Sequence, residues 1–322
     1  MIKRAIGGLL IITSIIAGMA VGVLLFLRVE PSGEQTNPYE YNIEEFRAVP
    51  ADLLRYVETN RTQPEVKGLH GLAVDSADRI YVVGAAVAIF DKAGQPAGGF
   101  SLSEPGLCLA VDGQGNVFVG MTNHIEVFGM DGTRKATWES LGEQALVTSV
   151  AIGSNDVFVA DFGSRLVWRF DGSGRLLGRI GEKDPARNVA GLILPSPCFD
   201  VAAGRDGTLW AAHTGNLRVE HFGPDGAGLG SWGKAAMTLD GFCGCCNPSH
   251  LALTPGGKFV TSEKGLPRVK VYDRDGEFEC VVAGPDQFAR DAAGLDVAVD
   301  SDGRVLVLDP AAGAVRIFER KK

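Results

Sequence analysis

The segment SVAIGSNDVFVADFGSRLVWRFDG, residues 149–172, decides the fold of this chain of 322 residues. It contains three short runs rich in β-branched and aromatic residues, which begin at Ser149, Val157 and Val167. Gly, Asp and Ser separate the runs, and Asp171-Gly172 follows the third; such residues favour the tight turns of β-hairpins. The segment therefore predicts successive antiparallel strands of one small sheet.

The same pattern occurs six times along the chain. The first run of each repeat is Gly71-Leu-Ala-Val-Asp75, Cys108-Leu-Ala-Val-Asp112, Ser149-Val-Ala-Ile-Gly153, Asp200-Val-Ala-Ala-Gly204, His250-Leu-Ala-Leu-Thr254 or Asp296-Val-Ala-Val-Asp300. A single four-stranded sheet cannot bury both of its faces, so the units must stack, and six of them close into a ring. The last unit ends after its third run, Val315–Phe318, and we expect a strand near residues 53–57 to complete it. The sequence predicts an all-β, six-bladed propeller over residues 51–322.

The order of Gly-Leu-Ala-Val-Asp, Val-Phe-Val-Ala-Asp and Arg-Phe-Asp-Gly resembles the NHL-repeat propellers over about residues 51–322. The resemblance implies a six-bladed ring but little about activity, because that fold carries enzymes, receptors and scaffolds. In NHL propellers the first residue of each repeat begins the innermost strand, near one mouth of the central channel. The residues at that position here are Gly71, Cys108, Ser149, Asp200, His250 and Asp296. The resemblance therefore implies that Cys108, Asp200, His250 and Asp296 line one mouth.

A second repeated position follows the second strand of each unit. Its residues are Gly84, Met121, Asp161, His213, Glu263 and Asp309. The NHL family commonly has Asp there, where it mainly accepts hydrogen bonds from turn amides. Glu263 and His213 depart from that pattern, so we treat both as candidate residues of the channel lining.

The N-terminus predicts a membrane anchor. Lys3 and Arg4 precede Ala5–Leu27, a stretch without charged residues that is long enough to span a bilayer as a helix. Basic residues stay on the cytoplasmic side, so residues 1–28 are expected to cross once, with the propeller extracytoplasmic, in the periplasm. Residues 29–50 then form a linker. The alternative is a signal peptide cleaved after Gly18-Met-Ala20.

Three of the six cysteines and one histidine fall within the stretch Asp240–His250. Cys243, Cys245, Cys246 and His250 offer three thiolates and an imidazole, a ligand set that suits zinc, copper or an iron–sulfur cluster. We take an iron–sulfur cluster as the first expectation, with Cys198 as a substitute ligand because it is in register with Pro248. Disulfides, or small buried side chains, are the alternatives, and disulfides gain weight outside the cytoplasm.

Composition and motifs narrow the function. The net charge of −8 argues against a nucleic-acid partner. The sequence has no Gly-x-Ser-x-Gly elbow, P-loop or His-Glu-x-x-His pair. Some NHL-like propellers are zinc lyases that hold the metal with several histidines, whereas this mouth has only His250. We therefore expect an electron-transfer or accessory subunit of a membrane complex rather than a stand-alone enzyme. The alternative is a cofactor-free protein-binding scaffold with structural disulfides.

Overall fold

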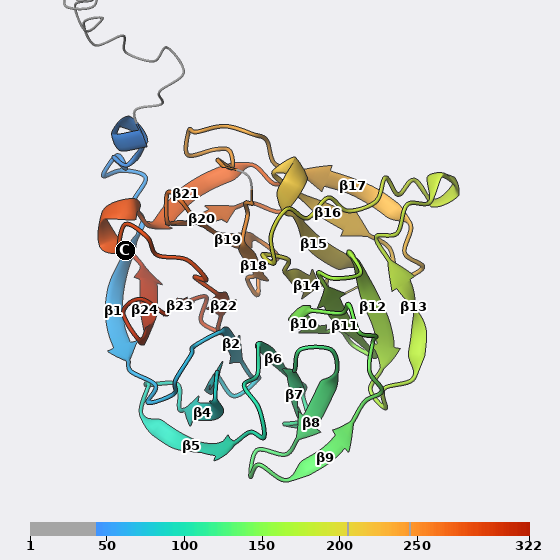
Figure 1. Cartoon of the computed structure of the whole chain (residues 1–322). Coiled ribbons are helices and arrows are strands. Elements are labelled where there is room, and N and C mark those ends of the chain that lie inside the picture. The colour runs from blue at the N-terminus through green and yellow to red at the C-terminus, as the bar shows by residue number, and fades with distance from the viewer. Residues whose placement is uncertain (1–42, 205, 245) are drawn as a thin grey trace, which may run out of the picture. The chain divides into compact units, whose positions relative to one another are not determined.

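Six four-stranded antiparallel sheets form the blades of a closed ring, which Figure 1 shows face on. The computed structural model describes residues 43–204, 206–244 and 246–322. Within these residues the only helices are short 3₁₀ turns, namely η1 (Ile43–Phe46), η2 (Pro185–Arg187), η3 (Thr214–Asn216) and η4 (Pro285–Gln287). The predicted all-β, six-bladed propeller is confirmed.

The first three blades follow the chain from the centre of the ring outward. Blade 1 contains β2 (Gly71–Val74), β3 (Ile80–Val83), β4 (Ala86–Phe90) and β5 (Pro96–Ser101). Blade 2 contains β6 (Cys108–Val111), β7 (Val117–Gly120), β8 (Ile125–Phe128) and β9 (Arg134–Thr137). Blade 3 contains β10 (Val147–Ile152), β11 (Asp156–Asp161), β12 (Leu166–Asp171) and β13 (Leu176–Ile180).

The other three blades have the same order, except that the last takes its outer strand from the N-terminal side. Blade 4 contains β14 (Val201–Ala203), β15 (Leu209–His213), β16 (Arg218–Phe222) and β17 (Gly228–Trp232). Blade 5 contains β18 (His250–Leu253), β19 (Phe259–Glu263), β20 (Arg268–Tyr272) and β21 (Phe278–Ala283). Blade 6 contains β22 (Val297–Val299), β23 (Val305–Asp309), β24 (Ala314–Arg320) and β1 (Tyr56–Thr62).

An aspartate side chain closes at least one hairpin turn in each blade, as the repeated Asp-Gly pairs suggest. Between β12 and β13, Asp171 Oδ1 accepts hydrogen bonds from the backbone N–H of Ser173 at 3.0 Å and of Arg175 at 3.1 Å. Gly174 in this turn has φ of 88°, a backbone conformation that glycine adopts at little cost. The turn chemistry therefore sets the register of the outer strands.

The ring closes through pairing of β1 with β24. The register runs from Tyr56 opposite Arg320 to Thr62 opposite Val315, with an irregularity between Glu58 and Asn60. This strand lies later in the chain than the sequence-based range 53–57. Leu54 instead forms a parallel bridge to Val281 in β21, at the neighbouring blade.

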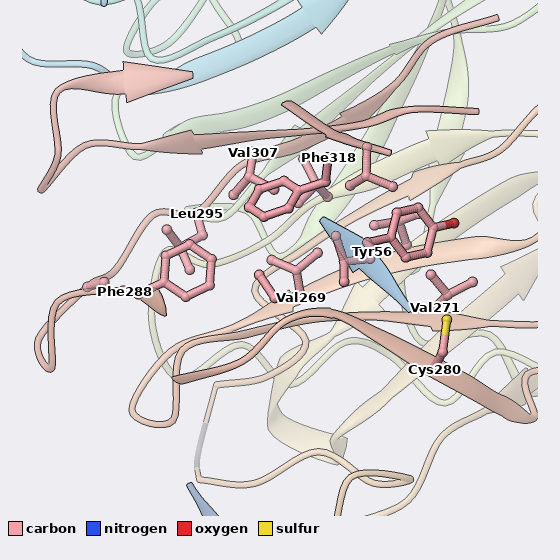
Figure 2. Packing of buried hydrophobic residues seen from close by; sticks show 14 residues of the cluster. Tyr56, Val269, Val271, Cys280, Phe288, Leu295, Val307 and Phe318 are labelled. Carbon is pink, nitrogen blue, oxygen red and sulfur yellow. The ribbon is translucent and has the colours of Figure 1, made fainter. Parts of the chain in front are cut away.

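The core lies between adjacent blades, as Figure 2 shows for blades 5 and 6. Tyr56 of β1 and Phe318 of β24 pack in one cluster with Val269 and Val271 of β20. Cys280 is fully buried in the same cluster. Closure of blade 6 thus adds both strand pairing and apolar contacts with blade 5.

The sequence-based anchor at residues 1–28 and the linker up to residue 42 lie outside the described residues. Among the residues that the structure does describe, no helix is long and apolar enough to cross a bilayer. The anchor therefore stays a prediction from the sequence.

Candidate functional site

The innermost strands of all six blades surround a central cavity of about 290 Å³. Its wall includes four of the ionisable residues that stand first in their repeats, Cys108, Asp200, His250 and Asp296. They come together because the first strands of neighbouring blades lie side by side around the ring, including β2 against β22. Residues at the same position of different repeats therefore lie close together, on the wall of the central cavity.

Asp200, His250 and Asp296 form the closest group on this wall. His250 Nδ1 lies 3.4 Å from Asp296 Oδ1 and 3.8 Å from Asp200 Oδ2. One ligand atom from each of the three residues lies within 4.8 Å of the others. Over residues 43–204, 206–244 and 246–322, no other three His, Cys, Asp or Glu side chains bring their ligand atoms this close. The His250 side chain is 19% exposed, so solvent reaches the group.

Both carboxylates are held in place by the blade that follows them. Asp200 Oδ2 accepts a hydrogen bond of 2.7 Å from the backbone N–H of Leu251 in β18. Asp296 Oδ2 accepts one of the same length from the backbone N–H of Leu72 in β2. These bonds link adjacent blades and orient the carboxylates, and each oxygen retains a further lone pair for His250 or for an ion.

The electrostatics of the group favour a charged imidazole. Burial works to lower the pKa of His250, but Asp296 and Asp200 outweigh it, and the pKa rises to about 9. Burial also raises the pKa of Asp200 to about 6, against the opposing effect of the His250 charge and with support from Asp296. In the metal-free protein an imidazolium between two carboxylates is therefore the preferred state near neutral pH.

The His250 interaction should make stability depend on pH. A group whose pKa rises on folding stabilises the folded state fully below its unfolded pKa, and that contribution is lost as pH rises through the folded value. For His250 the window runs from pH 6.5 to about pH 9. We expect wild type to lose about 3 kcal/mol relative to His250→Gln across this window, measured by urea unfolding. A constant difference between the two proteins would contradict the raised pKa. The pKa of Asp200, raised to about 6, places its own titration at the acid end of this window, so the difference is compared from pH 7 upward.

Cys108 lies on the same wall but is a poor ligand. Burial raises the pKa of its thiol, and the carboxylates of Asp296 and Asp200 raise it further. A methyl group on Gly120 of β7 would come within 2.4 Å of the Cys108 sulfur, so the thiol fills the space that this glycine leaves. Cys108 therefore contributes packing to the channel lining.

Cys243, the first cysteine of the loop between β17 and β18, lies against a buried cluster of charges. Glu263, Arg268 and Lys270 have no exposed side-chain surface. Glu263 Oε2 lies 2.8 Å from Arg268 Nη2 and Glu263 Oε1 lies 2.7 Å from Lys270 Nζ. The Cys243 sulfur is 3.6 Å from Glu263 Oε2 and 3.7 Å from Arg268 Nη2. Burial and Glu263 raise the pKa of the Cys243 thiol, while Arg268 opposes them.

The two cations of this cluster also hold the loop itself. Arg268 Nη1 donates to the carbonyl oxygen of Met237 at 3.2 Å. Lys270 Nζ donates to the carbonyl oxygens of Leu239 at 3.0 Å and Gly241 at 2.6 Å. The segment leading to the cysteines is thus fixed to blade 5 by buried charge-assisted hydrogen bonds.

Cys246 and Cys198 share a different surrounding, centred on Lys264. Burial works to lower the pKa of the Lys264 ammonium, and the interactions with Cys198 and Cys246 raise that pKa above its ordinary value. Cys198 also interacts with the charge of His250.

The predicted ligands Cys243, Cys246, His250 and Cys198 are thus distributed over three surroundings. Cys243 contacts Glu263. Both Cys246 and Cys198 interact with Lys264. His250 lies beside the two aspartates. Cys245 lies outside the described residues. A four-ligand centre made by Cys243, Cys245, Cys246 and His250 stays a prediction from the sequence.

The structure places Glu263 and His213 away from the residues that line the central cavity. Each ends the second strand of its blade, one strand removed from the channel. His213 Nε2 accepts the backbone N–H of Ile193 at 2.7 Å, and its Nδ1 lies 2.7 Å from Glu220 Oε1. Both ring nitrogens are therefore engaged, and His213 serves to hold the segment around Ile193.

Sequence reasoning missed the three cations, Lys264, Arg268 and Lys270. A signal was present in the repeats: Arg268 and Lys270 occupy the positions that hold Leu166 and Trp168 in blade 3. Cations at two buried positions of one strand need an anion, and Glu263 stands where blade 3 has Asp161.

Fold and site define a six-bladed β-propeller with an acid–imidazole group in its channel, and comparisons with known proteins agree on the fold. A crystal structure of a catalytically inactive virginiamycin B lyase from Staphylococcus aureus with quinupristin has a TM-score of 0.55 at 14% identity, covering 80% of this chain and 83% of that one. The structure of a streptogramin B lyase has a TM-score of 0.57 at 10% sequence identity, and the match covers 84% of this chain and 99% of that one. The WD40 propeller domain of Doa1 has a TM-score of 0.53 at 13% sequence identity, and the match covers 83% of this chain and 98% of that one.

Identities this low show a shared fold and nothing about activity. No family model matches the chain, and no curated protein sequence matches it. The resemblance to NHL repeats therefore stays an expectation from the sequence, whereas the six-bladed propeller is shown.

Proposed function

We propose that this chain is a membrane-tethered, extracytoplasmic propeller that binds a transition-metal ion at one mouth of its channel and serves a membrane complex as an electron-transfer or accessory subunit. The observation that carries the proposal is the convergence of Asp200, His250 and Asp296, whose ligand atoms lie within 4.8 Å of one another. The uncharged stretch Ala5–Leu27 after Lys3 and Arg4, from which the sequence predicts an anchor, supports the tether.

The chemistry of the donor set fits a mononuclear ion. One imidazole nitrogen and two carboxylate oxygens suit zinc or iron, and three protein ligands leave positions open for water or a partner group. The backbone amides of Leu251 and Leu72 hold the carboxylates, as groups behind metal ligands commonly do. His250 would have to lose a proton to bind, so affinity should rise with pH.

An iron–sulfur cluster fits the described residues less well. Such clusters need several thiolates, sometimes with imidazoles, around one point. Cys243 and Cys246 have different neighbours, Glu263 and Lys264 respectively. Three alternatives remain, and the metal analysis described next separates them. They are a thiolate-bound cluster, copper in place of iron or zinc, and a cofactor-free scaffold with disulfides.

Metal analysis of the purified full chain tests the proposal. We expect a stoichiometric transition metal in wild type, and a drop in occupancy of about tenfold or more in His250→Ala and in Asp296→Asn, because each removes one of three ligands. His124→Ala is the matched control, since His124 lies in a turn beside Asn123 and away from the channel group.

Two results would overturn the metal site. One is wild type without bound metal and with a melting temperature that added zinc or iron leaves unchanged, which would favour the cofactor-free scaffold. The other is visible absorbance with iron and sulfide that survives His250→Ala but is lost in Cys245→Ser, which would favour the cluster.

A further inference from the structure

A second cavity, of about 890 Å³, opens at the other end of the channel, where the innermost strands of blades 1, 4, 5 and 6 end. The residues that it shares with the first cavity are Val74, Ala203, Leu253 and Val299, each the last residue of its strand. Small-molecule sites in proteins typically enclose about 300–1,000 Å³. Asp200, His250 and Asp296 are not among the described residues that line this second cavity, so it is distinct from the proposed metal site.

An aromatic pair, Trp210 of β15 and His221 of β16, forms part of the wall of the second cavity. The two rings are stacked, with centroids 3.7 Å apart and an angle of 3° between their planes. Trp210 also meets the ring of Phe259 edge-on, at a centroid distance of 4.8 Å. His221 Nε2 is buried and has no hydrogen-bond partner among the residues that the structure describes. Because Trp210 and His221 are only half-buried, part of this aromatic surface is open to the cavity.

The repeats explain why the aromatic surface is uncovered in blade 4. The residue of blade 1 that corresponds to Trp210 is Tyr81, which is fully buried and donates a hydrogen bond of 3.0 Å from its hydroxyl to Asp75 Oδ2. Blade 4 has Gly204 where blade 1 has Asp75. A methyl group on Gly204 would come within 2.3 Å of Thr208 Oγ1. The carboxylate that engages Tyr81 therefore has no counterpart beside Trp210.

The charged side chains on the wall are of two kinds. Three carboxylates already have a cationic partner: Asp75 pairs with Arg79, Asp78 with Lys92 and Asp300 with Arg304. Asp206 and Arg274 also line the cavity, and neither forms a salt bridge with another residue in the described part of the chain. Asp206 Oδ1 accepts from the hydroxyl of Thr208 at 2.6 Å, and this bond lowers the pKa of Asp206, so its carboxylate is charged. Arg274 Nε donates to the carbonyl oxygen of Gly256 at 2.6 Å, which leaves both Nη atoms for a ligand.

We propose that this second cavity binds a neutral oligosaccharide. The apolar face of a sugar ring packs on an aromatic side chain, and Trp210 and His221 offer such a surface. Sugar hydroxyls both donate and accept hydrogen bonds, so one ligand can donate to Asp206 and accept from Arg274 in charge-assisted bonds. A charged ligand would be attracted by one of these two side chains and repelled by the other, whereas a neutral ligand meets both without that penalty.

The test is binding of the purified full chain to an array of neutral, anionic and cationic saccharides, followed by calorimetric titration with the neutral di- and trisaccharides that bind. We expect Trp210→Ala to lower the affinity about tenfold or more, because the stacking surface is lost. Asp206→Asn and Arg274→Met should each lower it about threefold or more, because a charge-assisted hydrogen bond is lost. Asp275→Asn is the matched control, since Asp275 is exposed, follows Arg274 and does not line the cavity.

Thermal unfolding of each variant accompanies the titration. Asp206→Asn and Arg274→Met alter exposed side chains, so they test the site even where Trp210→Ala lowers the melting temperature. Sugar binding that is equal with and without a chelator supports the proposal whatever the metal analysis finds. The proposal is overturned if no neutral saccharide binds at concentrations up to about 1 mM, or if charged saccharides bind better than neutral ones. Folded Trp210, Asp206 and Arg274 variants that all keep the wild-type affinity would overturn it as well.

Discussion

A chain that lacks β1, Tyr56–Thr62, is expected to aggregate and to unfold at a temperature lower by about 10 °C or more. The deletion leaves β24 with an unpaired edge and removes Tyr56 from the cluster between blades 5 and 6. Open edges invite pairing with other chains, and losing a buried aromatic side chain alone costs about 3–5 kcal/mol. Glu58 would also be lost from Arg316, whose Nη2 lies 2.6 Å from Glu58 Oε2.

Light scattering coupled to size exclusion, together with thermal unfolding, would measure this effect. The matched control deletes residues 43–49, which are equal in number and contain η1 but no strand. We expect the control to shift the melting temperature by only a few degrees. A β1-deleted chain that stays in its original assembly state with an unchanged melting temperature would show that the ring does not depend on this closure.

Replacing Glu263 by Gln is expected to destabilise the protein by about 3–5 kcal/mol, since it leaves two cations buried without their anion. Burial works to raise the pKa of Glu263, but Lys270 and Arg268 prevail and hold it below its ordinary value, so the carboxylate is ionised. Burial and Arg268 lower the pKa of Lys270 to about 8, whereas Glu263 raises it and so favours the charged ammonium. The loop that Arg268 and Lys270 hold through Met237, Leu239 and Gly241 should loosen with it.

Urea unfolding would give the change in free energy, and hydrogen exchange of the loop would report its opening. Glu104→Gln is the matched control, because Glu104 is exposed and lies outside the cluster. Wild-type stability should also fall as acid protonates Glu263 below its folded pKa, and the variant should lack that part of the acid dependence. A Glu263→Gln protein within about 1 kcal/mol of wild type would mean that the buried charges are compensated elsewhere.

The repeats alone determined the ring and the shared position of its first residues. Strands and turns alternate with a regular period in the sequence, and units of this kind bury their faces by stacking. The incomplete last unit, which needs a strand from the N-terminal side, favoured a closed ring over an open stack. The repeats give Asp200, His250 and Asp296 equivalent positions, and the resemblance to NHL propellers implied that this position lies at the channel. The exact bounds of β1 were harder to predict, because apolar and polar residues alternate less clearly in an edge strand. Tyr56 is buried, but the next apolar residue, Val57, is 46% exposed.

Only the tertiary structure decided which charges meet the cysteines. The loop from Gly233 to Ser249 has no repeat and little regular structure, so spacing within it does not tell where each side chain points. The sequence does not distinguish Cys243 from Cys246, yet Cys243 contacts Glu263 whereas Cys246 interacts with Lys264. Those neighbours follow each other on β19 and the turn after it, and successive residues of an extended chain point to opposite sides. The partner of each thiol is therefore set by the packing of the loop over blade 5, which depends on the buried bonds of Arg268 and Lys270.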